Sequence, residues 1–170
     1  MKEEHAPTAE NPSPRVPWNK GKLVGAKPPL KPSQVWSIRT KLQIECKKRD
    51  PALFNLAIDN KLRGCDVVAV RVDDVAPSEY SMDRATIRQK KTGRPVRFKL
   101  MDQARQALDG YLRLTGRKSG QFLFSGRGDK RGLTTRQYAR LVQEWVASIG
   151  LDPTKFGTHS LRRTKSAPIY

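Results

Sequence analysis

The sequence predicts an α+β fold: a mainly α-helical domain with a small antiparallel β-sheet that carries a basic hairpin. Apolar residues recur every three or four positions in several separate segments, which is typical of helices that bury one face. A short run of almost entirely β-branched or apolar residues is followed by two segments that flank a tight basic turn with glycine, which is typical of strands and a hairpin. With 36% hydrophobic residues among 170, the chain can bury one modest core.

Residues 1–32 are predicted to form a proline-rich, basic and largely disordered arm. They hold seven of the twelve prolines, interspersed with lysine and glycine. Proline breaks helices because it lacks a backbone N–H. Residues 33–170 are then expected to form the folded domain.

Two helices are expected to follow the arm. Ser33 is the predicted N-cap of a helix over residues 34–48. Asp50 and Pro51 suit the N-cap and first helical position of a second helix, which should end near Lys61.

The middle of the chain is predicted to form strands. Residues 67–72 are almost all β-branched or apolar, which favours a buried strand. Residues 84–90 and 95–100 are two further strands, joined by a basic hairpin tip at residues 91–94.

Three more helices complete the prediction. The first begins at Asp102 and ends before Gly116. Thr134 caps the most regularly patterned helix, which stops at Gly150. A last helix begins at Thr158 and runs toward the C-terminus.

The charge of the chain points to a polyanionic partner. Lysine and arginine outnumber aspartate and glutamate by 34 to 16, which gives a formal net charge of +18 and a pI of about 10.4. Such an excess repels itself in a compact state unless a polyanion neutralises it. Nucleic acid is therefore the expected partner, and a solvated basic surface is the alternative.

Several classes of protein do not fit the sequence. No apolar run is long enough to cross a bilayer, and the N-terminus lacks the apolar stretch of a signal peptide. Cys46, Cys65, His5 and His159 are too few and too scattered for a metal site. Motifs of nucleotide hydrolases and metalloproteases are missing. We expect no membrane association, no metal and no cofactor.

Basic residues at structural junctions form the candidate site. Arg63 lies between a predicted helix and a predicted strand, Lys91 at the hairpin tip, and His159 with Arg162 in the first turn of the last helix. Two guanidiniums can bind the non-bridging oxygens of a phosphodiester and stabilise its transition state without a metal. Taken singly, each residue is explained as a solvated surface side chain, so the prediction depends on their joint occurrence.

Three motifs in this order resemble those of the tyrosine recombinases, also called phage integrases. Residues 61–68 resemble the first-arginine motif, residues 89–96 the β-hairpin that bears the lysine, and residues 159–163 the His-x-x-Arg box. The resemblance covers about residues 33–170. It implies that this part is most of the family's catalytic domain.

The resemblance also implies roles for individual residues. Arg63 and Arg162 would clamp the scissile phosphate, His159 would assist proton transfer at the nucleophile, and Lys91 would protonate the departing 5′-oxygen. The implied DNA-binding residues are Arg63, Lys90, Lys91, Arg94, Arg162 and Arg163.

The end of the chain departs from the family pattern. The family places its nucleophilic tyrosine well beyond the His-x-x-Arg box, whereas Tyr170 lies only eight residues after Arg162. We therefore expect an incomplete domain that lacks its nucleophile and is inactive as given, with Tyr170 not acting as one. A separate N-terminal core-binding domain is also expected to be missing.

The predicted function is that of a DNA-binding fragment of a site-specific recombinase, whose full-length form would cut and rejoin DNA through a 3′-phosphotyrosyl intermediate. The expected partners are double-stranded DNA and other recombinase protomers on it, in a cytoplasmic, nucleoid-associated, bacterial or phage-type setting. One alternative is a non-catalytic DNA-binding module. The other is a basic RNA-binding protein, which would need stacking aromatics on an exposed sheet, where the sequence offers only Tyr80 and Phe98.

Overall fold

The computed structural model describes residues 20, 25–128 and 131–165. Most of the predicted arm and Tyr170 lie outside these residues. In chain order the elements are α1 (Pro32–Ile44), α2 (Arg49–Asn60), α3 (Gly64–Ala69), α4 (Val72–Val75), β1 (Arg84–Arg88), β2 (Pro95–Lys99), α5 (Asp102–Thr115), α6 (Thr135–Ser148) and α7 (Thr158–Thr164). The predicted α+β class is confirmed, because helices predominate and β1 pairs with β2 in an antiparallel sheet.

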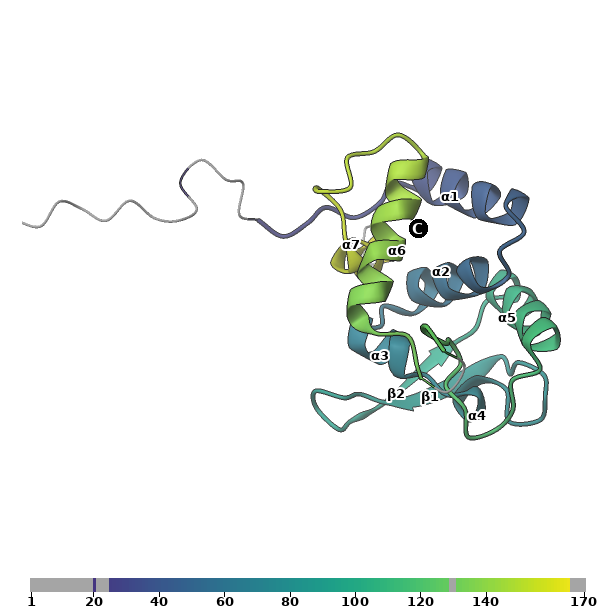
Figure 1. Ribbon diagram of the computed structural model, residues 1–170. Helices are drawn as coiled ribbons and strands as arrows, with labels where there is room; N and C mark the ends of the chain where they lie inside the picture. The colour runs from purple at the N-terminus through teal and green to yellow at the C-terminus, as the bar shows by residue number, and fades with distance from the viewer. Residues whose placement is uncertain (1–19, 21–24, 129–130, 166–170) are drawn as a thin grey trace, which may run out of the picture.

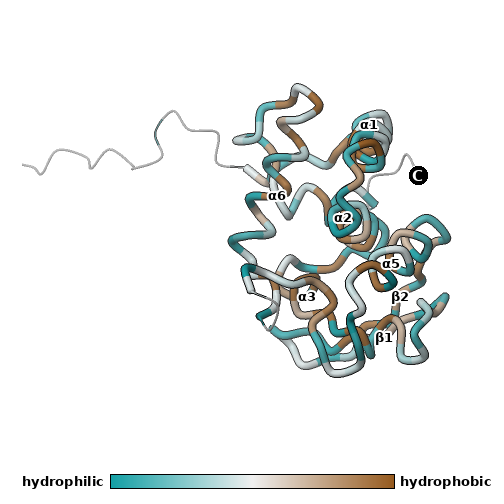
Figure 2. Tube along the Cα trace, turned by 45° about the vertical axis from the view of Figure 1, so that its right-hand side comes forward, coloured by the Kyte–Doolittle hydropathy of each residue, from teal (hydrophilic) through white to brown (hydrophobic). Residues whose placement is uncertain are grey.

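The helices pack around α2, which contacts α1, α3, α5 and α7 (Figure 1). α6 runs beside them, against α1 at one end and against α3 at the other. The sheet lies with α3 and α4 at the end of the molecule opposite α1. Figure 2 shows both hydrophobic and hydrophilic positions along the helices, as expected of helices that each bury one face.

One hydrophobic core joins these elements. The Phe54 and Trp145 rings meet edge to face with centroids 5.5 Å apart, which joins α2 to α6. The Trp145 Nε1 donates to the buried Asp50 carboxylate at 3.3 Å, so the indole is both packed and hydrogen-bonded.

α5 and α6 have the starts and stops that the sequence predicts. α5 ends at Gly116, which takes the left-handed conformation with φ 61° that glycine adopts without strain. Thr134 caps α6, and its hydroxyl accepts a hydrogen bond from the Gln137 amide at 3.1 Å.

The bounds of the first two helices differ from the prediction. α1 begins at Pro32, whose fixed φ suits the first helical position, and it ends at Ile44, well before residue 48. The chain then turns through Cys46, which has a positive φ of 55°. α2 begins at Arg49, so Asp50 lies inside the first turn and is not its N-cap.

The predicted strand over residues 67–72 is wrong. Residues 67–69 are the end of α3 and Val72 begins α4, and between the two helices Arg71 forms only an isolated bridge with Phe122. Val67, Val68 and Val70 are all buried, and a short, wholly apolar run has the same pattern in a buried helix as in a buried strand.

The other two predicted strands are confirmed as β1 and β2. Their register pairs Arg84 with Lys99 and Arg88 with Pro95. In β1 the buried positions alternate with exposed ones, so Ala85 and Ile87 face the core while the basic residues face outward.

None of the helices among the described residues is long and apolar enough to span a membrane.

Candidate functional site

Arg63 lies directly before α3 and has a buried donor nitrogen. The residue is half-buried, in the extended N-cap position of α3. Its Nη1 is buried and has no hydrogen-bond partner among the described residues. Buried guanidinium nitrogens are normally paired, because an unmade hydrogen bond costs about 1–3 kcal/mol. The structure therefore holds a donor that a ligand oxygen could satisfy.

Asp66 attaches the hairpin to the helix that follows Arg63. The Asp66 side chain is on α3, three residues after Arg63, and the residue is 2% exposed. Its Oδ1 accepts a hydrogen bond from the Lys90 amide at 2.9 Å. This contact places the backbone of the hairpin tip next to α3. The Lys90, Lys91 and Arg94 side chains are exposed on that tip.

Arg162 attaches α7 to the same part of the chain from the other side. Its Nε donates to the Lys61 carbonyl at 3.0 Å, two residues before Arg63. The start of α7 also packs on the start of α3, because a Cβ added at Gly64 would lie 3.6 Å from Thr158 Cβ. The second and third motifs are thus both attached within three residues of Arg63.

The structure brings most of the predicted site residues to one part of the molecule. Arg63, Arg162 and the tip that carries Lys91 lie around the link from α2 to α3. His159 is exposed on the first turn of α7. Arg163 points elsewhere, since its Nη1 donates to the Lys27 carbonyl at 3.3 Å. The roles of these residues in binding DNA remain predictions.

Sequence reasoning missed Asp66 and the carbonyl of Lys61. Asp66 directly precedes residues that the sequence predicts as a strand, which conceals its place in a helix. An acidic residue in the first turn of a helix was the signal that could have identified it. The Lys61 carbonyl carries no side-chain signal, and Lys61 has the left-handed φ of 52° that ends α2.

The described tyrosines do not provide a nucleophile at this site. Tyr138 packs against Gly64, and burial raises the pKa of its phenol, which opposes formation of a phenolate. Tyr111 is buried and accepts a hydrogen bond from Arg117 Nε at 3.2 Å. Tyr80 is exposed in the segment between α4 and β1.

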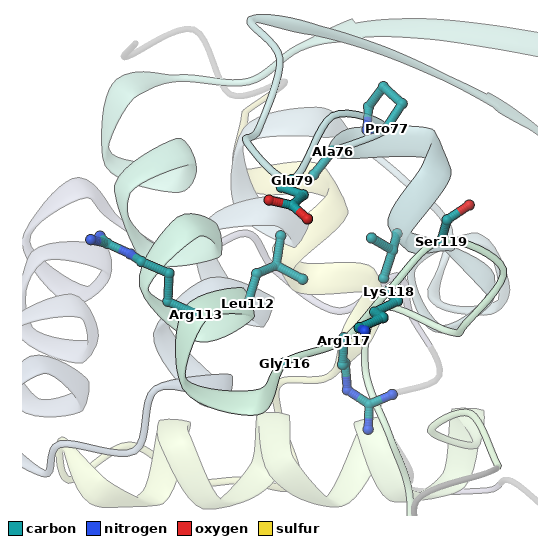
Figure 3. A pocket seen from close by; sticks show the side chains of 10 residues that line it. Ala76, Pro77, Glu79, Leu112, Arg113, Gly116, Arg117, Lys118 and Ser119 are labelled. Carbon is teal, nitrogen blue, oxygen red and sulfur yellow. The ribbon is translucent and has the colours of Figure 1, made fainter.

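A cavity of about 460 Å³ lies away from the predicted site, between α4, the end of α5 and the loop after it. Figure 3 shows Glu79 and Leu112 among its lining, with the Arg113 side chain directed away from them. None of the predicted site residues lines it. The described residues also contain no group of three or more His, Cys, Asp or Glu side chains that could hold a metal ion.

Comparison with known proteins gives one family and one fold. The profile described as "Phage integrase family" matches residues 29–170. No curated protein sequence matches the chain.

Similar solved structures include recombinases and integrases. The crystal structure of XerA recombinase is similar with a TM-score of 0.67 and 17% identity, over 80% of this chain and 48% of that one. A post-cleavage complex of XerH site-specific recombinase with a palindromic difH substrate has a TM-score of 0.63 and 16% identity, over 82% of this chain and 41% of that one. The Tn1549 transposon integrase in complex with circular intermediate DNA has a TM-score of 0.53 and 19% identity, over 86% of this chain and 55% of that one. This chain therefore spans about half the length of the structures it matches.

Proposed function

Because this chain belongs to the phage integrase family of tyrosine recombinases, we propose that it binds duplex DNA and holds one phosphodiester between Arg63 and Arg162. The observation that supports this most is that Arg63 Nη1 is buried without a partner among the described residues, while Arg162 is attached to the Lys61 carbonyl two residues before Arg63. Guanidinium groups bind phosphate oxygens through charge-assisted hydrogen bonds of fixed geometry. Two of them can neutralise the charge that develops in the transition state.

His159 and Lys91 supply the proton transfers in this proposal. His159 lies three residues before Arg162 on α7, so both side chains reach the same phosphate. It assists proton transfer at the attacking hydroxyl. Lys91, on the exposed hairpin tip, protonates the departing 5′-oxygen.

The complete reaction in this proposal is cleavage and rejoining of DNA through a 3′-phosphotyrosyl intermediate. The covalent link keeps the energy of the broken phosphodiester, so rejoining needs no nucleotide hydrolysis. Further protomers on the DNA belong to the same proposal. So does a cytoplasmic, nucleoid-associated location in a bacterial or phage-type setting.

The RNA-binding alternative finds little support in the described residues. It requires aromatic side chains displayed on the sheet for base stacking. Phe98 of β2 is buried, and the exposed Tyr80 lies outside both strands. A non-catalytic DNA-binding module uses the same contacts without turnover, so cleavage distinguishes it from the proposed enzyme.

Duplex affinity measured by fluorescence anisotropy across a salt series tests the proposal. Arg63→Ala with Arg162→Ala should weaken binding and lower the slope of log Kd against log salt by about 0.9, because the two side chains hold one phosphate and each phosphate contact contributes that amount. Arg113→Ala with Lys118→Ala is the matched control, because it also removes two positive charges, from exposed side chains at the distant cavity. Equal losses in the two proteins, or a preference of the wild type for single-stranded RNA, would contradict the proposal.

The role of Lys91 has its own test. A general acid matters to the leaving group and little to binding, so Lys91→Ala should retain most of the duplex affinity. In a form of the protein that carries the nucleophilic tyrosine, Lys91→Ala should fail to cleave a nicked duplex, and a bridging 5′-sulfur should restore cleavage because sulfur leaves without a proton. Loss of cleavage in Lys90→Ala, with no rescue of Lys91→Ala by sulfur, would assign the role to Lys90.

A further inference from the structure

A segment far from α7 in the sequence runs along this helix. Lys27 Nζ donates to the Phe156 carbonyl at 3.0 Å, just before α7 begins. At the other end of the helix, the Leu30 amide donates to Thr164 Oγ1 at 3.0 Å. Residues 27–30, here called the strap, therefore span α7 from one end to the other.

The strap is joined to the core as well as to α7. The Leu30 side chain is 2% exposed and belongs to the hydrophobic core. Thr164 Oγ1, which accepts from the Leu30 amide, also donates to the Ser160 carbonyl at 2.7 Å, so one buried hydroxyl links the strap to the interior of α7. Arg163 Nη1 adds a contact to the Lys27 carbonyl at 3.3 Å.

The Lys27 side chain lies close to the backbone of Gly157, just before α7. A Cβ added at Gly157, the residue before α7, would lie 3.3 Å from Lys27 Nζ, so glycine leaves the room that the ammonium occupies. An ammonium that donates to a carbonyl fixes the position of the backbone more closely than an apolar side chain of the same length, because hydrogen bonds are directional.

The strap and Arg162 hold α7 from two separate attachments. α7 has seven residues, too few to be a stable helix without tertiary contacts. Arg162 Nε donates a hydrogen bond to the Lys61 carbonyl. The strap donates hydrogen bonds to the Phe156 carbonyl before α7 and to the hydroxyl of Thr164, the last residue of α7.

We propose that the strap is a positioning element, which sets the place of α7 and thereby the place of Arg162 relative to Arg63. The proposal rests on the proposed function of Arg162, and Lys27 and Thr164 are its positioning residues. It assigns the strap no contact with DNA.

The test uses three variants of lysine in the full chain. Lys27→Met removes the hydrogen bond at nearly constant length, and Lys27→Arg keeps a charged donor. Lys31→Met is the matched control, because it removes the same charge four residues later from an exposed side chain.

The first readout is hydrogen exchange without DNA. In Lys27→Met the amides of α7 should exchange about 10-fold faster, since a hydrogen bond to a charged group is lost, while those of α5 stay unchanged. Lys27→Arg and Lys31→Met should exchange like the wild type. Unchanged α7 exchange in Lys27→Met, or equal acceleration in Lys31→Met, overturns the proposal.

The second readout is duplex affinity. Lys27→Met should bind about 5- to 10-fold more weakly, Lys27→Arg should restore binding, and Lys31→Met should lose at most about 3-fold. If Lys27 acts through Arg162, the loss caused by Lys27→Met should shrink when Arg162 is already alanine. If Lys27→Met weakens duplex binding by the same factor when Arg162 is alanine, the positioning role is overturned.

Thr164 gives an independent check that leaves all charges in place. Thr164→Val removes the hydroxyl that joins the strap to α7, and Thr164→Ser retains it. The proposal is supported if α7 exchanges faster in Thr164→Val and not in Thr164→Ser. Equal exchange rates in these two variants contradict it. If the wild type fails to bind duplex DNA, the proposed function fails, whereas the exchange measurements still decide whether the strap holds α7.

Discussion

α6 and α7 are neighbours in the chain and are held in different ways. α6 has 14 residues, a threonine cap and a buried face that includes Trp145. α7 has seven residues, buries Leu161 in the core and is also held by hydrogen bonds to residues 27, 30 and 61. The comparison teaches that α6 is stabilised mainly by its cap and its buried face, whereas the position of the shorter α7 also depends on polar contacts to the backbone.

The largest expected effect falls on the scaffold. Trp145→Ala removes a side chain that is 3% exposed and should lower the free energy of unfolding by about 3–5 kcal/mol. Trp36→Ala is the control, because Trp36 is 66% exposed and should cost no more than about 0.5 kcal/mol. Urea unfolding measures both. Similar losses of unfolding free energy in the two variants would show that Trp145 is not part of the stabilising core.

The next effect falls on the polar attachment of the hairpin. Asp66→Ala removes the acceptor of the Lys90 amide and should cost about 1–3 kcal/mol, with faster exchange of that amide. Asp66→Asn keeps an acceptor oxygen and should lose less. If Lys90 remains equally protected in Asp66→Ala, the hairpin is held by something other than Asp66.

A smaller effect is expected at the cap of α6. Thr134→Ala should lower the free energy of unfolding by about 1 kcal/mol, because the Gln137 amide loses its partner, and Thr134→Ser should be nearly neutral. Neither change should alter duplex affinity. Weaker binding at unchanged stability would show that the scaffold and the site are not separable in this way.

The smallest effect concerns pH at the junction of α2 and α7. Burial raises the pKa of the Asp59 carboxyl, although Arg39 and Lys165 act in the opposite direction. Because the folded pKa lies above the unfolded one, folding favours the protonated form. This contribution is fully present below the unfolded pKa and is lost as the pH rises through the folded pKa. Melting temperatures of the wild type should therefore fall relative to Asp59→Asn from the ordinary carboxyl pKa upward, and parallel curves would contradict this.

The sequence predicted the long elements well because their signals are local. The apolar period, the Thr134 cap and Gly116 all act within a few residues, and they place α6 and α5 correctly. The prediction for residues 67–72 failed because all four valines of this short run are buried, which removes the periodicity that separates helix from strand.

The site was predictable as a set of residues and not as an arrangement. Arg63, Lys91 and Arg162 follow from motifs in the sequence. The contacts that attach their elements do not, because the Lys90 amide and the Lys61 carbonyl are backbone groups that every residue has. Their use depends on the tertiary fold.

Hydrogen exchange with and without a DNA duplex tests the central claim, that DNA is held by the start of α3 together with α7 and the hairpin tip, each of which contacts α3 or the link before it. Bound DNA should slow exchange in residues 63–66, 89–94 and 157–163. It should leave the end of α5 and residues 116–121, at the distant cavity, unchanged. Slower exchange at the cavity, with none at α3, the tip or α7, would contradict the account.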